Sequence, residues 1–198
     1  MLKNKKFIIG LAAGVVIVLA ILFYSGVIKF DVPLAPYSSP AFGISFEYPE
    51  QWVADVQGGS YEGVPLRFVG SDGYFGLDAL PAADDNGAEL TLDNLATRMV
   101  QPYQTSDGKT IVPYGKSPTI KSTVIDGAEA RVILPSDDQS ESARHEAIFV
   151  ARYPEEIKIS ENFFRFLIIY AQKDYLENIL RTLHFSVLQK DAEKIPVK

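Results

Sequence analysis

The chain has 198 residues, no cysteine and a formal net charge of −6 at pH 7. The lack of cysteine excludes disulfides, cysteine-ligated metal centres, a cysteine nucleophile and a lipid anchor attached to a cysteine. Residues 1–29 hold no acid and four lysines, Lys3, Lys5, Lys6 and Lys29, so the remainder carries −10. An acidic domain is a poor partner for DNA, RNA or acidic lipid headgroups, and we expect no nucleic-acid partner.

A long apolar run, residues 7–28, contains no charged side chain. As a helix it would be roughly 33 Å long, which is enough to cross a hydrocarbon core of about 30 Å. The basic segment 1–6 precedes it, and the positive-inside bias then predicts a cytoplasmic N-terminus. We expect a single-pass transmembrane helix in the cell membrane, with the C-terminal domain outside. A cleaved signal peptide is the alternative, but its apolar region is shorter, and Tyr24 stands where cleavage requires a small residue.

Residues 29–40 contain three prolines, which favour an extended spacer over a helix. The folded domain is predicted to span residues 41–188. It opens on residues 42–48, where apolar residues alternate with small or polar ones at the period of a strand. Further strands follow, several of them joined by tight Asp-Gly turns. In chain order these predicted strands are 52–56, 66–69, 74–80, 120–125, 128–134 and 146–153.

The loop 81–89 contains the acidic sequence Asp84-Asp85-Asn86 ahead of Gly87, which suggests a calcium loop. In that alignment Ala82 would fall at the first ligand position and Asp93 at the last, where a glutamate is required. The match therefore fails at both ends. We interpret the segment as a solvated acidic turn and predict no metal ion and no cofactor.

Residues 92–101 are predicted to form a short amphipathic helix with Thr91 as its N-cap. Pro102 ends this helix, and the loop 103–118 follows. Apolar and aromatic side chains in this loop are of the kind that dominate protein interfaces. The candidate partner-binding residues are Tyr103, Ile111, Val112 and Tyr114. The alternative is an ordered loop that packs its own aromatic residues.

The stretch 163–171 is almost continuously apolar, which is typical of a strand buried on both faces, and we place it at the centre of the sheet. The last helix starts near Asp174, its predicted N-cap. Its core-facing stripe is Leu176, Ile179, Leu180 and Leu183. Residues 184–188 are predicted to be an edge strand and 189–198 a polar tail. The predicted fold is α+β, with a central antiparallel sheet and helices on both faces, preceded by one transmembrane helix.

The opening FGISFEYPEQW, the antiparallel strands after it and the closing YLENILRTLHF resemble the PsbP-like family, named for the extrinsic protein of photosystem II. The resemblance covers residues 42–187. It implies an α/β/α sandwich and a role as an accessory or assembly factor on a larger complex. The matching residues are core and turn positions, so the resemblance implies no ligand residues.

Common catalytic motifs are missing from the sequence. There is no GxSxG, HExxH, P-loop or GxGxxG, and neither His145 nor His184 lies in a nucleophile motif. We therefore predict a noncatalytic binding or assembly module that acts on another envelope or membrane protein. The alternative is a cell-envelope hydrolase whose carboxylates meet in space rather than in sequence.

Overall fold

The computed structural model describes residues 32–55, 57, 59–61, 64–139, 146–159 and 161–186. From Leu34 onward they belong to a single unit. The predicted span 7–28, the basic segment 1–6 and the tail 189–198 lie outside the described residues. Within the described part of the chain, no helix is both long and apolar enough to cross a membrane.

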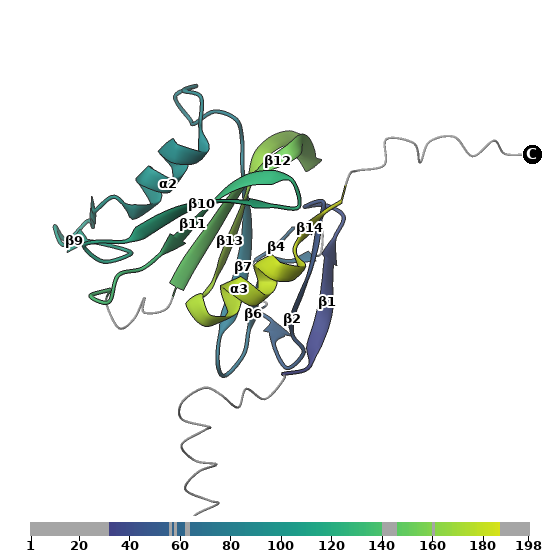
Figure 1. Cartoon of the computed structure of the whole chain (residues 1–198). Helices are drawn as coiled ribbons and strands as arrows, with labels where there is room; N and C mark the ends of the chain where they lie inside the picture. The colour runs from purple at the N-terminus through teal and green to yellow at the C-terminus, as the bar shows by residue number, and fades with distance from the viewer. Residues whose placement is uncertain are drawn as a thin grey trace, which may run out of the picture. The chain divides into compact units, whose positions relative to one another are not determined.

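Strands dominate the described chain, and two helices accompany them (Figure 1). The helices are α2 (Leu92–Val100) and α3 (Lys173–Thr182). The strands are β1 (Leu34–Ser39), β2 (Ile44–Pro49), β3 (Val53–Ala54), β4 (Ser60–Tyr61), β5 (Val64–Pro65), β6 (Arg67–Val69), β7 (Tyr74–Leu80), β8 (Tyr103–Gln104), β9 (Thr110–Ile111), β10 (Thr119–Ile125), β11 (Ala128–Leu134), β12 (Glu146–Ile159), β13 (Asn162–Gln172) and β14 (His184–Phe185).

The larger sheet has seven strands in the order β10-β11-β12-β13-β7-β6-β3, and every neighbouring pair is antiparallel. β13 is the middle strand, as its apolar sequence predicted, and its residues Phe166 to Ile169 are at most 1% exposed. The register of β12 on β13 shifts between Arg152 and Ile157, which marks a β-bulge. The predicted central antiparallel sheet is thus confirmed.

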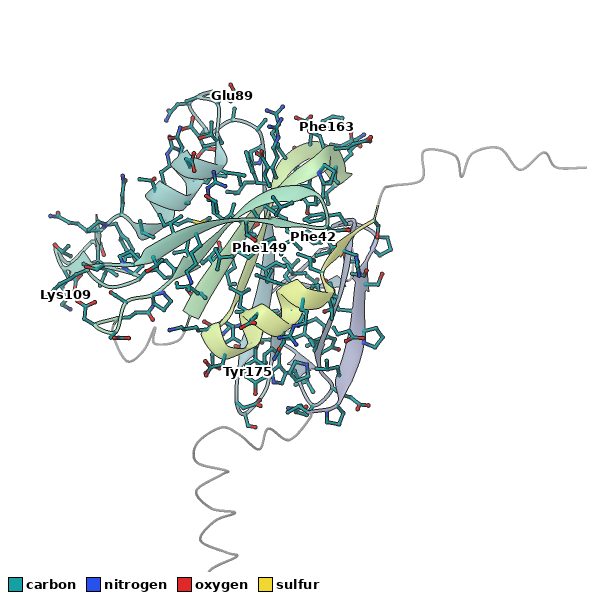
Figure 2. All side chains as sticks on the ribbon, viewed as in Figure 1. Phe42, Glu89, Lys109, Phe149, Phe163 and Tyr175 are labelled. Atoms are coloured by element: carbon teal, nitrogen blue, oxygen red, sulfur yellow. The ribbon has the colours of Figure 1, made fainter. Side chains whose placement is uncertain are left out.

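The two faces of this sheet carry separate apolar clusters, because side chains alternate along each strand. Even-numbered residues of β12 and β13 join the α2 cluster: Ile148, Val150, Phe166 and Ile168. Odd-numbered residues join the α3 cluster: Ala147, Phe149, Ala151, Leu167, Ile169 and Ala171. α2 and α3 lie on opposite sides of the sheet (Figure 1), and Phe149 lies between the sheet and α3 (Figure 2).

The segment predicted as a proline-rich spacer, 29–40, is partly a strand, and this corrects the predicted domain boundary. β1 pairs with β2, and Tyr37 stacks on Phe46 with 4.8 Å between the ring centroids. β1 is an edge strand, where proline is tolerated because its missing N–H faces away from the ladder. The domain therefore begins at Leu34 rather than at residue 41. The predicted strand at 184–188 is confirmed only over β14, which joins β1 and β2 in a second sheet that contacts α3.

Asp72, in the turn between β6 and β7, ties Trp52 to α3. The indole Nε1 of Trp52 donates to Asp72 Oδ1 at 2.8 Å, and the hydroxyl of Tyr175 on α3 donates to the other oxygen. Both hydrogen bonds lower the pKa of Asp72, and the bond from Tyr175 has the larger effect. The turn thereby fixes the position of a core indole and of the first turn of α3.

We predict that Asp72→Asn lowers the melting temperature at neutral pH. Because the folded-state pKa of Asp72 lies below the unfolded value of about 3.9, its ionised form stabilises the fold above about pH 4. That contribution is lost as the pH falls through the folded-state pKa. Melting curves of both proteins between pH 7 and pH 2.5 should therefore converge at the acid end. A difference that stays constant with pH would contradict the role of the carboxylate.

Candidate functional site

The structure separates the four residues predicted to bind a partner. Tyr103 is 55% exposed, and Ile111 and Val112 are half-buried. Tyr103 and Ile111 pair across the β8–β9 hairpin, which carries Lys109 near its tip (Figure 2). Tyr114 is only 5% exposed and belongs to the α2 cluster, so it is a core residue and not part of a binding surface. For Tyr114, the alternative of a loop that packs its own aromatic residues is the correct one.

The hydroxyl of Tyr114 donates to Glu146 Oε1 at 2.9 Å, and that of Tyr74 donates to Glu146 Oε2 at 2.6 Å. Burial, together with the carboxylate, raises the pKa of both tyrosines, so both stay protonated and act as donors. Each oxygen of Glu146 is therefore occupied by a tyrosine. This arrangement anchors the loop after α2 to β7 and β12.

Asp78 is another carboxylate on the α2 face of the sheet. Desolvation raises its pKa, which is the direction that a general acid needs, although the side chain also reaches solvent. Its Oδ1 accepts the backbone N–H of Ala79 at 2.8 Å. Asp78 thus satisfies a backbone N–H of β7 beyond the end of its pairing with β6, which is a structural role.

The acidic turn before α2 is also engaged. Asp84 accepts the backbone N–H groups of Asn86 and Ala88, each at 3.0 Å, and pairs with Arg98 of α2 at 3.0 Å. Among the described residues, no three or more His, Asp or Glu side chains are grouped so that they could hold a metal ion. Asp84 is therefore a bridge from the turn to α2.

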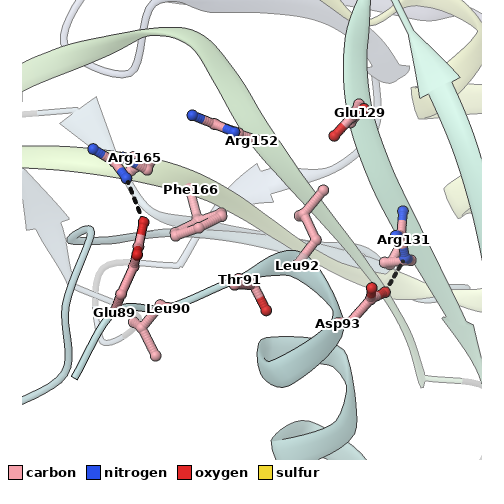
Figure 3. A pocket seen from close by; sticks show the side chains of 10 residues that line it. All are labelled: Glu89, Leu90, Thr91, Leu92, Asp93, Glu129, Arg131, Arg152, Arg165 and Phe166. Atoms are coloured by element: carbon pink, nitrogen blue, oxygen red, sulfur yellow. Dashed lines mark hydrogen bonds and ion pairs between the residues drawn. The ribbon is translucent and has the colours of Figure 1, made fainter.

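A groove of about 190 Å³ lies where the N-terminus of α2 meets the larger sheet (Figure 3). Three adjacent strands each contribute one arginine: Arg131 from β11, Arg152 from β12 and Arg165 from β13. The other lining residues come from the segment entering α2 and from the strands: Glu89, Leu90, Thr91, Leu92, Asp93, Glu129 and Phe166.

Two of the three arginines are held by acids. Arg131 donates through Nε to Asp93 Oδ1 at 2.8 Å. Arg165 donates to Glu156 Oε1 through Nε and Nη2, at 2.8 and 2.5 Å, and its Nη1 lies 3.4 Å from Glu89 Oε1. These ion pairs fix the two guanidinium groups at either side of the groove.

Arg152 differs from its two neighbours. It is exposed, and its guanidinium has no hydrogen-bond or ion-pair partner within the described part of the chain. Figure 3 accordingly draws no dashed line from Arg152 to the other lining residues. At the start of α2, Asn94 N–H is capped by Thr91 Oγ1 at 3.2 Å, and Leu95 N–H makes the first helical bond to Thr91 O. The two N–H groups before Asn94 precede the first helical bond, as at every helix start.

The groove can therefore bind a carboxylate. An unpaired guanidinium forms charge-assisted bonds with anions, and the positive end of the α2 dipole favours negative charge at the same place. Several of its polar side chains are already engaged, since the Thr91 hydroxyl caps the helix and Asp93 and Glu89 pair with arginines; Glu129 is the lining carboxylate without a partner among the described residues. The geometry favours binding over reaction.

This groove was not predicted from the sequence. The three arginines lie in predicted strands, but only the register of those strands brings them side by side. The available signal was weak: each of three apolar strands is interrupted by one arginine.

No family model matches the chain, and no curated protein matches it. The fold is similar to the solution structure of cyanobacterial PsbP from Synechocystis sp. PCC 6803, with a TM-score of 0.43 and 16% sequence identity. The match covers 79% of this chain and 94% of that chain. A resemblance to a PsbP protein is thus found in the structural comparison as well as in the sequence.

Proposed function

We propose that this chain is a membrane-anchored, extracytoplasmic binding module, a PsbP-like α/β/α sandwich that acts without catalysis on another envelope protein. The groove beside α2 receives a carboxylate-bearing segment of that partner. The predicted span 7–28 supplies the anchor. The observation that carries the proposal is the guanidinium of Arg152, which has no partner among the described residues and lies between two arginines that pair with acids.

A carboxylate in this groove would gain hydrogen bonds to a charged donor, each contributing roughly 1.5–3 kcal/mol. Residues 30–198 carry −10, so the domain as a whole repels an acidic segment at long range, and recognition depends on the groove itself. Anchoring both proteins in one membrane raises their effective concentration without any new contact. A groove of modest affinity is therefore sufficient for function.

We predict that Arg152→Glu abolishes partner capture. Tagged full-length protein would be purified from detergent-solubilised membranes of its own cells, and the co-purifying proteins quantified. Wild type should retain a stoichiometric membrane partner, and Arg152→Glu should retain at least roughly tenfold less, which corresponds to about 1.4 kcal/mol. Because Arg152 is exposed and has no partner among the residues that the structure describes, thermal unfolding should hardly change.

Arg181→Glu is the matched control. Arg181 is an exposed arginine on α3, on the other side of the sheet, and pairs only with Glu177 at 3.6 Å among the described residues. The Arg181→Glu variant should capture the partner as wild type does. Equal capture by both variants would rule out the groove, and no partner with wild type would rule out the binding role. Turnover of an envelope substrate that is lost in Asp78→Asn or Glu146→Gln would establish the hydrolase alternative.

A further inference from the structure

β10 is an open edge of the larger sheet. It pairs with β11 over seven consecutive residues without a register shift, and no second strand pairs with it in the described chain. Two apolar side chains stand out on this strand: Ile120 is 40% exposed and Val124 is 63% exposed. An open strand edge carries unpaired N–H and C=O groups that can pair with another chain.

Three other edges that the structure describes are protected. At the opposite end of the larger sheet, β3 has only two residues. In the part of β7 that extends beyond β6, the side chain of Asp78 accepts the backbone N–H of Ala79, so this N–H is not free to pair with another strand. The edge strand β1 contains Pro36, which has no backbone N–H to donate. β10 has neither a proline nor a bulge, and its one charged residue is Lys121. It is therefore better suited to adding a strand than these three edges.

The outward backbone groups of β10 follow from its hairpin. Asp126 and Gly127 form a two-residue loop with φ values of 49° and 80°, the conformation of a type I′ turn. The flanking residues Ile125 and Ala128 then exchange hydrogen bonds, and bonded and non-bonded pairs alternate from there. The N–H and C=O groups of Ile120, Ser122 and Val124 consequently point away from β11.

We propose that β10 pairs with β10 of a second copy of this chain, antiparallel about a two-fold axis at Ser122. Ser122 would then face Ser122, and Ile120 would face Val124 on both sides of the axis. All three outward residues pair, giving about six backbone hydrogen bonds. Lys121 faces Thr123, so no like charges meet. A shift of the register that places the axis at Lys121 would bring the two copies of Lys121 face to face and remove the Ile120–Val124 pairs.

This dimer goes beyond the proposed function and is compatible with it. The two-fold axis is perpendicular to the continuous sheet, so the β1-β2-β14 layers of both copies lie on the same side of it. Two chains anchored in one membrane need this arrangement. Pairing along one strand buries less area than a standard interface, and anchoring offsets this by raising the effective concentration.

A self-cross-link at the axis tests the proposal, since the chain has no cysteine of its own. Directly opposite residues in a hydrogen-bonded pair have Cα atoms about 5.5 Å apart, which a disulfide can span. Full-length Ser122→Cys in membranes should therefore form a covalent dimer under mild oxidation. Thr119→Cys is the control, because its counterpart would lie six residues along the partner strand, about 20 Å away. Equal cross-linking of the two variants, or none, would overturn the proposal.

A second variant tests the dimer without a covalent bond. Ser122→Lys would place two ammonium groups face to face at the axis while leaving the β10–β11 ladder intact. Light scattering in mild detergent should give a dimer for wild type and a monomer for Ser122→Lys. Thermal unfolding of the two should be the same at protein concentrations low enough to dissociate the dimer. A monomeric wild type, or a Ser122→Lys variant that remains dimeric, would refute the interface.

Discussion

Gly70→Ala is expected to destabilise the domain by about 3 kcal/mol or more, because a methyl group there would enter the indole of Trp52. A Cβ on Gly70 would lie 2.1 Å from Trp52 Cδ1 and 2.4 Å from Nε1. The indole is 2% exposed, and its Nε1 is bonded to Asp72. The ring also packs against Tyr175, with 4.8 Å between the ring centroids, and a Cβ on Gly73 would lie 2.7 Å from Cζ2, so the ring has little room to move.

Denaturant unfolding followed by tryptophan fluorescence measures this loss directly, since Trp52 is the chain's one tryptophan. Gly76→Ala is the matched control. A Cβ at Gly76 would make an ordinary contact of 3.6 Å with Leu66 O, and alanine suits a strand better than glycine does by roughly 0.5–1 kcal/mol. If both variants lose the same stability, the packing of Trp52 on the β6–β7 turn is not the cause.

Local chemistry explains which elements the sequence could predict. Thr91 caps α2 as expected, because a hydroxyl one residue before an apolar helical stripe meets the free N–H of Asn94. The Asp126-Gly127 step forms the predicted two-residue hairpin, since both positions tolerate positive φ. The centre of the sheet was also predictable, because a strand buried on both faces has no polar alternation.

Elements decided by tertiary contacts were predicted poorly. Pro36 suggested a spacer, but β1 is stabilised by pairing with β2 and by the ring stacking of Tyr37, which no local pattern reveals. The N-cap of α3 is Gln172, without a side-chain cap, rather than the predicted Asp174. Packing of Leu176 and Ile179 in the α3 cluster positions this helix, so a cap was not required.

The candidate site was the least predictable part, because it depends on register. Arg131, Arg152 and Arg165 become neighbours only when three strands align, and sequence spacing does not encode that alignment. Tyr114 shows the opposite error. An aromatic residue in a proline- and glycine-rich loop suggested an exposed interface residue. In the structure its hydroxyl donates a hydrogen bond to Glu146, so the ring can be buried at little cost in free energy.

Ile168→Ala is expected to cost about 2–5 kcal/mol of unfolding free energy, because Ile168 lies on the middle strand and is 1% exposed in the α2 cluster. Ile179→Ala should cost a similar amount, since Ile179 of α3 is equally buried in the α3 cluster. Leu180→Ala is the internal control, because Leu180 is only partly buried and should lose less. A loss under about 0.5 kcal/mol at both isoleucines would contradict the assignment of two cores.

The double variant Ile168→Ala/Ile179→Ala then tests whether the two cores are independent. Their clusters lie on opposite faces of one sheet and share no residue. Mutations without shared partners add to within roughly 0.3–0.5 kcal/mol, so the losses should sum. Urea unfolding of the single and double variants measures the coupling. A coupling energy above about 1 kcal/mol would mean that the central strands transmit strain between the groove beside α2 and the layer beside α3.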